Sequence, residues 1–335
     1  MARVRPGRDD EDPQRRTMSS DGNGDSGTLG AALKWPAGLP PPDTLTLITD
    51  TISAPGQFLI ANFTATALKL ISAAVSSRGE PSGHVILLSF CQIFNHYHQI
   101  ALKLGVNLGA AKAAGTFSFI DGLTKLADYR GSSKFQVVGA STVPVDSQPS
   151  TTVPAFPVRR GASSSDGTSL ATSWVGGLLQ EIESRLVANG GPTPSSLSGE
   201  DMPIVYMLID DITVLMDIGA PLGVVQSFVH ACRTLVSKHG GSLIVLTHAD
   251  EPIRGEYGEP IDPVAGVIGY LHGCADYILQ LEGLASGRSR DVSGQLIAAR
   301  GPLCASESFQ PIVLHYSIHE KGARFFAPGA SQAVL

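Results

Sequence analysis

The sequence predicts an α/β fold with a mostly parallel central sheet, helices on both faces and antiparallel hairpins on the C-terminal side. Two observations lead to this prediction. Through the first 126 residues, short apolar runs alternate with segments of helical period, which is the pattern of right-handed βαβ units. After Gly273, pairs of short apolar runs are separated by polar turns, which is typical of antiparallel hairpins.

The elements of the first half have clear limits. Strands are expected where apolar runs are bounded by Gly or Pro, and helices where apolar residues recur at three- and four-residue spacing. The expected order is a strand at 44–50, a helix at 57–79, a strand at 84–90, a helix at 92–105 and a strand at 116–122. The sheet therefore begins with consecutive parallel strands.

The second half continues this alternation and then departs from it. The expected elements are a helix at 169–191 interrupted at Gly176-Gly177, a strand at 203–211, a helix at 224–241, a strand at 242–248, and antiparallel pairs at 275–300 and 310–327, the last turning at Lys321-Gly322. A parallel core with antiparallel strands appended at its C-terminal side is the RecA-like layout of P-loop proteins.

Domain limits follow from composition. Residues 1–42 carry six basic and six acidic residues among Gly, Ser and Pro, which predicts a disordered N-terminal tail. Residues 43–335 are expected to form a single RecA-like domain. A flexible insertion at about 128–168 and a shorter polar loop at about 190–201 interrupt it, because no hydrophobic period survives there.

The overall composition excludes several classes of protein. An apolar fraction of 43% excludes a wholly disordered chain, and 16% charged residues is low beside the roughly 25% of typical globular proteins. Part of the surface is therefore expected to be covered by partners. The net charge of −6 argues against a stand-alone nucleic-acid binder.

The cysteines and the N-terminus bear on the compartment. The four cysteines are scattered without a CxxC pair, which predicts neither a disulfide framework nor a four-Cys zinc site. The N-terminus is charged where a signal peptide is apolar, and no run of 18 apolar residues occurs. We therefore expect a cytoplasmic protein without membrane contact, and the nucleus stays open as a second location.

The turn after the first strand is the position of the phosphate loop in a P-loop enzyme. That loop needs glycines for backbone contact, a lysine for phosphate charge and a hydroxyl for magnesium. Here Thr51 replaces the first glycine, Gln57 the lysine and Phe58 the hydroxyl, and Pro55 removes an N–H donor; only Gly56 agrees. The phosphate loop is degenerate, so we expect no catalytic residues and no cofactor bound by this chain alone.

Two aspartates follow the strongest strand signal. Asp210 and Asp211 stand where a P-loop enzyme has its second acidic element, and they could hold magnesium through water. The alternative is that they cap the following turn, and we favour it because a carboxylate without a phosphate loop binds magnesium poorly. Thr247 and His248 end the next strand, where we favour a satisfied polar pair over a sensor. We expect no metal site.

Candidate RNA contacts are local. Arg288 and Arg290 lie in an expected hairpin turn, and Arg254 lies in the acidic loop 249–265. None of these arginines sits in a strongly basic surface, so any RNA contact is expected to be shared with other subunits.

Longer blocks carry a resemblance to a known family. The blocks are SFCQIFNHYHQIALKLGVNL (89–108), FSFIDGL (117–123), VYMLIDDITVLMDIGAP (205–221) with VVQSFVHACRTL (224–235), LEGLASGRSRDVSGQLIAAR (281–300) and RFFAPGASQAVL (324–335). Together they resemble the Elongator complex protein 6 family. The resemblance runs from about residue 44 to the C-terminus, and the N-terminal tail and the 128–168 insertion lie outside it.

The resemblance implies a RecA-fold subunit that has lost the usual phosphate loop. Such a subunit joins Elongator proteins 4 and 5 in a heterohexameric ring that docks on the catalytic Elongator subcomplex. The ring helps bind tRNA and supports modification of the wobble uridine (U34) of the anticodon. Two readings stay open: a non-catalytic assembly subunit, which we favour, and a diverged ATPase subunit with ATP at ring interfaces.

Overall fold

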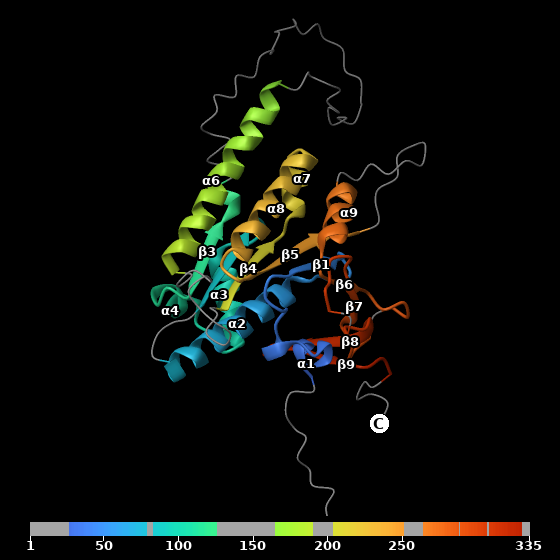
Figure 1. The fold of residues 1–335 in the computed structure, drawn as a ribbon. Helices are drawn as coiled ribbons and strands as arrows, with labels where there is room; N and C mark the ends of the chain where they lie inside the picture. The colour runs from blue at the N-terminus through green and yellow to red at the C-terminus, as the bar shows by residue number, and fades with distance from the viewer. Residues whose placement is uncertain are drawn as a thin grey trace, which may run out of the picture.

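The computed structural model describes residues 27–78, 83–125, 165–189, 204–250, 264–287, 289–306 and 308–329 (Figure 1). These residues build one nine-stranded sheet in the order β3-β2-β4-β5-β1-β6-β7-β8-β9. The strands are β1 (Leu45–Asp50), β2 (Gly83–Ser89), β3 (Phe117–Asp121), β4 (Ile204–Asp210), β5 (Ser242–His248), β6 (Tyr277–Glu282), β7 (Gly294–Arg300), β8 (Ile312–His319) and β9 (Gly322–Phe326). β1 to β6 pair in parallel, and β6 to β9 form antiparallel pairs.

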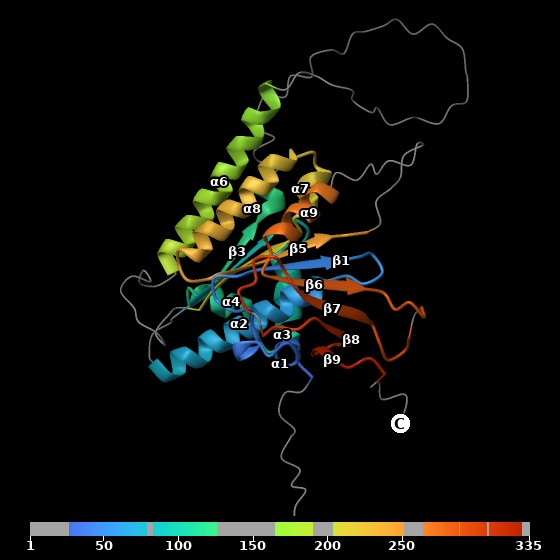
Figure 2. The same ribbon diagram turned by 45° about the vertical axis from the view of Figure 1, so that its right-hand side comes forward.

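Helices cover both faces of the parallel part, as Figure 2 shows. One face carries α1 (Leu29–Leu33), the 3₁₀ helix η1 (Pro36–Gly38), α2 (Gln57–Arg78), α3 (Phe94–Lys103) and α4 (Leu108–Ala113). The other face carries α6 (Ser165–Asn189), α7 (Thr213–Asp217), α8 (Leu222–Ser237) and α9 (Ala265–Cys274). The central strands are buried on both faces, as parallel strands normally are.

Each face has its own hydrophobic core. On the α6 side, Trp174, Leu178, Ile182 and Leu186 recur at four-residue spacing and form one buried stripe against the sheet. On the other side, α2 supplies a buried face that includes Phe63. The sheet therefore lies between two apolar layers, and the places for a polar site are the ends of its strands.

α2 is also apolar enough to span a membrane by length and composition, over Gln57–Val75. Half of that window is buried inside the protein, and the helix packs on the sheet over β2 and β4. Its apolar character is thus explained by the core it covers.

The predicted fold class is confirmed, and the strand at 242–248 has the predicted bounds. The predicted antiparallel pairs are also present, although β7 and β8 pair as well, so the hairpins join into one antiparallel sheet. His319 pairs with Gly322, which places the last turn at Glu320 and Lys321, one residue earlier than expected. α4 and α7 are short helices that the sequence pattern did not indicate.

The predicted tail of residues 1–42 is too long, because the fold begins by residue 27. Leu29, Leu33 and Trp35 are buried in the core. These few apolar residues stand among many charged residues, glycines, serines and prolines, so the average composition of residues 1–42 did not reveal them. The prediction for residues 1–26 falls outside the described residues.

The limits of the long helix also differ from expectation. α6 starts at Ser165, inside the predicted 128–168 insertion, and continues through Gly176-Gly177 without a break. The buried stripe of this helix is long enough to offset the roughly 1 kcal/mol that each glycine costs in a helix. The rest of the insertion and the predicted 190–201 loop lie outside the described residues.

Candidate functional site

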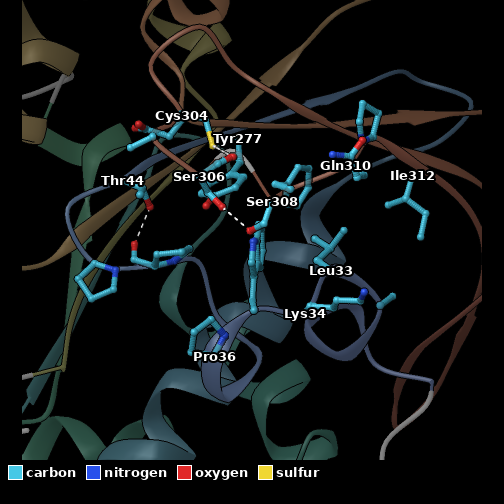
Figure 3. Close-up of a pocket in the computed structure, with 18 of the residues that line it drawn as sticks. Leu33, Lys34, Pro36, Thr44, Tyr277, Cys304, Ser306, Ser308, Gln310 and Ile312 are labelled. Carbon is cyan, nitrogen blue, oxygen red and sulfur yellow. Dashed lines mark hydrogen bonds between the residues drawn. The ribbon is translucent and has the colours of Figure 1, made fainter.

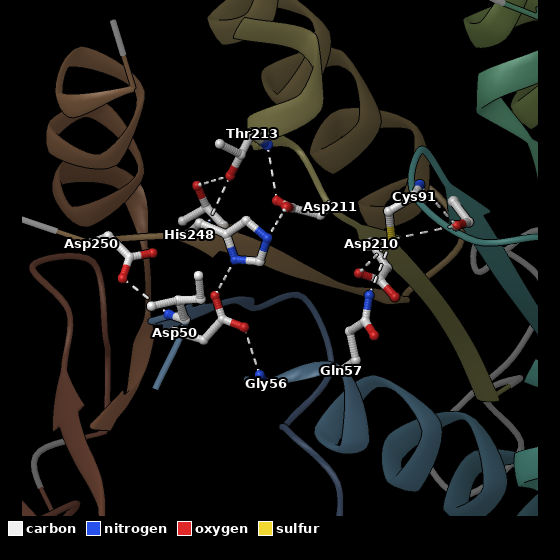
Figure 4. A network of polar contacts seen from close by, with 12 residues as sticks. Asp50, Gly56, Gln57, Cys91, Asp210, Asp211, Thr213, His248 and Asp250 are labelled. Carbon is white, nitrogen blue, oxygen red and sulfur yellow. Dashed lines mark hydrogen bonds and ion pairs between the residues drawn. The ribbon is translucent and has the colours of Figure 1, made fainter. Parts of the chain in front are cut away.

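The candidate site lies where the carboxyl ends of β1, β4 and β5 meet. Asp50 ends β1, Asp210 ends β4 and His248 ends β5, and Asp50 pairs directly with His248 in the strand register. Open α/β sheets bind their ligands at this edge. Figure 4 shows that Asp50 and His248 point toward one another, whereas Asp210 points toward Cys91.

The turn after β1 is closed on itself. The Ala54 N–H donates to the Thr51 carbonyl at 2.9 Å, and the Ile52 N–H donates to Asp250 Oδ1 at 3.0 Å. Pro55 has no N–H to offer. A phosphate loop needs such donors aimed at the ligand. In this turn they are bonded to the chain instead.

The backbone of Gly56 is closely packed against neighbouring strands. Its N–H donates to Asp50 Oδ2 at 2.5 Å. A Cβ at this position would lie 2.9 Å from Leu281 Cδ1 and 3.0 Å from Leu246 Cδ1. The one position that agrees with the phosphate-loop pattern therefore contacts the sheet edge.

Gln57 and Phe58 both contact other side chains of this chain. Gln57 Nε2 donates to Cys91 Sγ at 3.3 Å. Phe58 stacks on Tyr316, with ring centroids 5.0 Å apart, and on Phe325 at 6.4 Å. Gln57, at the position of the lysine, thus joins the hydrogen-bonded network of Cys91 and Asp210, and Phe58, at the position of the magnesium-binding hydroxyl, packs against the antiparallel strands.

His248 bridges two buried carboxylates. Its Nδ1 contacts Asp50 Oδ1, and its Nε2 lies 2.8 Å from Asp211 Oδ2. These two carboxylates raise the pKa of His248 to about 11, so the imidazole is charged at neutral pH. The ring is 46% exposed and forms the solvent side of the cluster. Asp211 Oδ1 also accepts the Thr213 N–H at 2.9 Å, which is the capping arrangement.

Asp210 belongs to a separate, buried network. Its carboxylate accepts the Tyr97 hydroxyl at 2.5 Å and the Cys91 thiol at 3.4 Å. Burial, together with the charge of Asp210, raises the pKa of Cys91 to about 12, which keeps the thiol protonated as a donor. Burial also raises the pKa of Asp210 to about 6. Asp210 therefore faces protein donors rather than solvent.

This donor set does not fit a magnesium triphosphate. The amides of Ile52, Ala54 and Gly56 are bonded to the chain itself, and His248, which ends β5, is paired with two carboxylates. Among the described residues, no group of three or more His, Cys, Asp and Glu side chains is placed to hold a metal ion.

The other predicted residues are placed as follows. Thr247 Oγ1 lies 3.1 Å from Thr213 Oγ1, and both side chains are buried at the carboxyl end of β5. Arg290 is exposed in the turn between β6 and β7. Arg254 and Arg288 lie outside the described residues.

Sequence reasoning missed Asp50 and Tyr97. Asp50 ends an apolar strand as Asp210 does, and carboxyl ends of parallel strands converge, so its position carried a usable signal. Tyr97 carried none, because a tyrosine on a helix face is most often a packing residue.

The chain matches a family model and several known proteins in sequence. The family model described as Elongation complex protein 6 matches residues 28–141 and 170–320. The chain is 29% identical over 300 residues to Elongator complex protein 6 of Xenopus laevis, covering 88% of this chain and 95% of that protein. It is 28% identical to the proteins of the same name from Mus musculus and Homo sapiens, each over 87% of this chain and 93% and 92% of theirs.

Proposed function

The chain belongs to the Elongator complex protein 6 family, and from this premise we propose that it is a non-catalytic RecA-fold subunit of the Elongator complex. In this proposal it joins Elongator proteins 4 and 5 in a heterohexameric ring. The ring docks on the catalytic Elongator subcomplex, helps bind tRNA and supports modification of the wobble uridine. The subunit acts in the cytoplasm, with the nucleus as a second location.

The observation that carries the proposal is the closed turn after β1. It keeps the strand-turn-helix shape of a nucleotide loop, but Thr51 and Asp250 take up the N–H groups of Ala54 and Ile52. A scaffold with this shape and without phosphate donors is suited to assembly rather than to phosphoryl transfer, which depends on positioned charge.

Ile52 offers a contact for a neighbouring subunit. Its side chain is 92% exposed although its N–H is held by Asp250. A rigid aliphatic side chain that projects from a sheet edge loses little entropy when a partner covers it, which favours it as an interface anchor.

Co-expression with the two sister subunits and native mass measurement tests the assembly. We expect a heterohexamer for the wild-type chain and loss of that particle for Ile52→Asp. The matched control is Val187→Asp, since Val187 is a 70% exposed aliphatic residue on α6, away from the turn. A hexamer of unchanged stability with Ile52→Asp contradicts the role of the turn, and the lack of any particle with the wild type contradicts the proposal.

The non-catalytic role is tested by ATP hydrolysis of the assembled ring. We expect Asp210→Asn and Asp211→Asn rings to hydrolyse ATP at the wild-type rate, since both carboxylates are engaged by this chain's own side chains. A rate that falls tenfold or more in either ring identifies a diverged ATPase subunit instead.

Binding of tRNA is proposed for the ring and not for the isolated chain. The chain has a net charge of −6, and nucleic-acid affinity depends on phosphate neutralisation. Titration of tRNA at several salt concentrations is expected to give salt-sensitive binding to the ring and a flat response with the isolated chain.

A further inference from the structure

A hollow of about 570 Å³ lies beside the candidate site, between the turn after β1 and the turn that joins β6 to β7. Both turns start at the carboxyl ends of neighbouring parallel strands, as Figure 2 shows. At Gly283 they approach so closely that a Cβ would lie 3.1 Å from Ser53 Oγ. The described lining residues are glycines, serines and the aliphatic Ile52, Leu284 and Val292, none of which carries a charge. The two turns therefore form one neutral surface.

The wall formed by the turn after β1 is fixed by bonds within the chain. Besides the two backbone bonds described above, Thr51 Oγ1 and Ser53 Oγ lie 2.9 Å apart. The side chain of Ile52 projects from this turn and is 92% exposed. A well-fixed backbone thus presents an aliphatic side chain to solvent at the rim of the hollow.

The wall formed by the β6–β7 turn is equally well defined. The Gly287 N–H donates to the Leu284 carbonyl at 2.9 Å, and the φ of Gly287 is +86°, which other residues rarely adopt. At the base of the turn, the Ser293 N–H donates to the Tyr316 carbonyl at 2.8 Å, and Ser293 Oγ accepts the Ile318 N–H at 3.0 Å. Because both walls are already ordered, a partner pays little entropy to bind them.

The polar groups of the hollow do not favour a phosphate. Ser53 Oγ bonds within its own turn, and Ser293 Oγ and Ser289 Oγ each accept a backbone N–H. Arg290 is followed directly by Asp291, so these two described residues add no net charge beside the hollow. Since phosphate and RNA binding depends on an excess of cations, we expect neither ligand here.

The aliphatic side chains favour a protein partner instead. Ile52 stands at the rim, and Leu284 and Val292 line the hollow beside it. The centre of a protein–protein interface is poor in charge, and a few apolar side chains that fill pockets supply most of its binding energy. The hollow is also continuous with Ile52, the side chain through which we propose that the chain contacts its neighbour.

A second cavity, of about 810 Å³, lies at the amino ends of β1 and β6 and is shown in Figure 3. Its aromatic lining residues Trp35, Tyr277 and Phe309 are only 3% to 8% exposed and belong to the hydrophobic core. These rings stabilise the fold and offer little surface to a partner. The hollow beside Ile52 is therefore the better candidate for an interaction.

We propose that a neighbouring subunit of the Elongator ring inserts an uncharged loop with an aliphatic or aromatic side chain at its tip into this hollow. The inserted side chain packs on Leu284 and Val292, while Ile52 packs on the neighbour beside that loop. A heterologous ring contact joins two different surfaces, so only one of the two neighbours occupies the hollow. The inference rests on the proposed function and names the surface that carries the contact.

The first test is the stability of the ring on dilution. The chain is co-expressed with Elongator proteins 4 and 5, and the particle is followed by native mass measurement at decreasing concentration. Leu284→Asp places a charge in the neutral hollow, so we expect this ring to dissociate at a concentration about tenfold higher than the wild type, or more. Ser289→Arg, at an exposed lining residue, is the second variant if Leu284→Asp unfolds.

The matched control is Leu303→Asp. Leu303 is 51% exposed, and its N–H donates to the Ala275 carbonyl, next to the amino end of β6 and away from the hollow. We expect this ring to dissociate at the wild-type concentration. Thermal unfolding of each isolated chain shows whether the variant is folded.

The second test is a photo-crosslink in the assembled ring. Benzoylphenylalanine is placed at Ser289, and tRNA is added to one of two samples. We expect mass spectrometry to find a crosslink to a single sister subunit in both samples. The same group at Leu303 should give no crosslink to that peptide.

Three results overturn the inference while the ring still forms, so that the proposed function stands. They are wild-type stability of the rings with folded Leu284→Asp and Ser289→Arg, an equal loss of stability with Leu303→Asp, and a crosslink from residue 289 to tRNA with none to a subunit. The last result would make the hollow an RNA contact. If the wild-type chain forms no ring, the proposed function fails and this inference fails with it.

Discussion

The two ends of the parallel strands differ in how their polar groups are satisfied. At the carboxyl end, Asp50, Asp210 and Asp211 are buried and each contacts a donor of the same chain. At the amino end, the Trp35 indole N–H is buried without a partner beside a cavity of about 810 Å³. At the edge where this fold class usually binds ligands the carboxylates are engaged by this chain's own groups, and the cavity beside Trp35 lies at the other end of the strands.

The amino end is nonetheless firmly built. Arg233 donates to the Cys274 carbonyl at 2.6 Å and pairs with Asp276 at 2.8 Å, which ties α8 to the start of β6. The indole of Trp35 is itself packed against Phe63 and Tyr277, with ring centroids 6.1 Å and 5.2 Å away.

The largest expected effect is a loss of stability caused by a substitution near the amino ends of the parallel strands. A Cβ at Gly30 would lie 2.1 Å from the Gly38 Cα, so Gly30→Ala forces α1 away from η1 and opens the wall of the cavity. We expect a loss of about 3 kcal/mol or more in the free energy of unfolding, measured by urea titration. Gly223→Ala on α8 is the control, because nothing lies within 4 Å of a Cβ there. A loss below 1 kcal/mol for Gly30→Ala would contradict the packing.

A smaller effect is expected at the carboxyl end with His248→Ala. The variant leaves Asp50 and Asp211 without their cation and should cost about 2 kcal/mol, less than a fully buried pair because the ring is half-exposed. The control is His230→Ala, an exposed residue on α8.

The raised pKa of His248 also predicts how the free energy of unfolding depends on pH in the wild type and in this variant. The pKa of His248 in the folded chain, about 11, lies above the value of about 6.5 for an unfolded histidine. The stabilisation is therefore complete below about pH 6.5 and is lost as the pH rises through about 11. Urea titrations from pH 6 to 10 should show a steeper decline for the wild type than for the variant, and parallel curves would refute the ion pair.

A third effect is expected for Asp210→Asn, and it concerns only how stability changes between pH 4 and 6. Because burial raises the pKa of Asp210 from 3.8 to about 6, the folded chain holds its proton more tightly than the unfolded chain does. Stability should therefore fall as the pH rises from 4 to 6, by about 1–2 kcal/mol, and Asp210→Asn should remove this decline. Thermal unfolding of both chains at several pH values measures it, and an identical slope in the variant would count against the buried network.

The last variant is expected to have no effect on ATP binding. Gln57→Lys combined with Phe58→Ser restores the phosphate-loop residue types but not the amides, which Thr51 and Asp250 still occupy. We expect no ATP binding at millimolar nucleotide by calorimetry. Micromolar binding would mean that the turn opens readily, and the contrast between the two edges would lose its basis.

Much of the fold followed from local pattern. The strand at 242–248 was predicted with its bounds because a short apolar run between a glycine pair and a polar residue is a local signal. α1 was missed because five helical residues carry too little periodicity, and the buried Trp35 stands among prolines and glycines. The prediction of a degenerate phosphate loop rested on the residue types at Gln57 and Phe58, which gave no sign of the hydrogen bonds inside the turn.

The sequence by itself determined the order and type of the main elements and the residue types in the turn after the first strand, because both depend on residue type and short-range spacing. Only the tertiary structure decided which polar atoms meet. Asp50 and His248 are 198 positions apart, and the Trp35 cavity joins segments from both ends of the chain. Such contacts depend on strand order and packing, which local spacing does not encode.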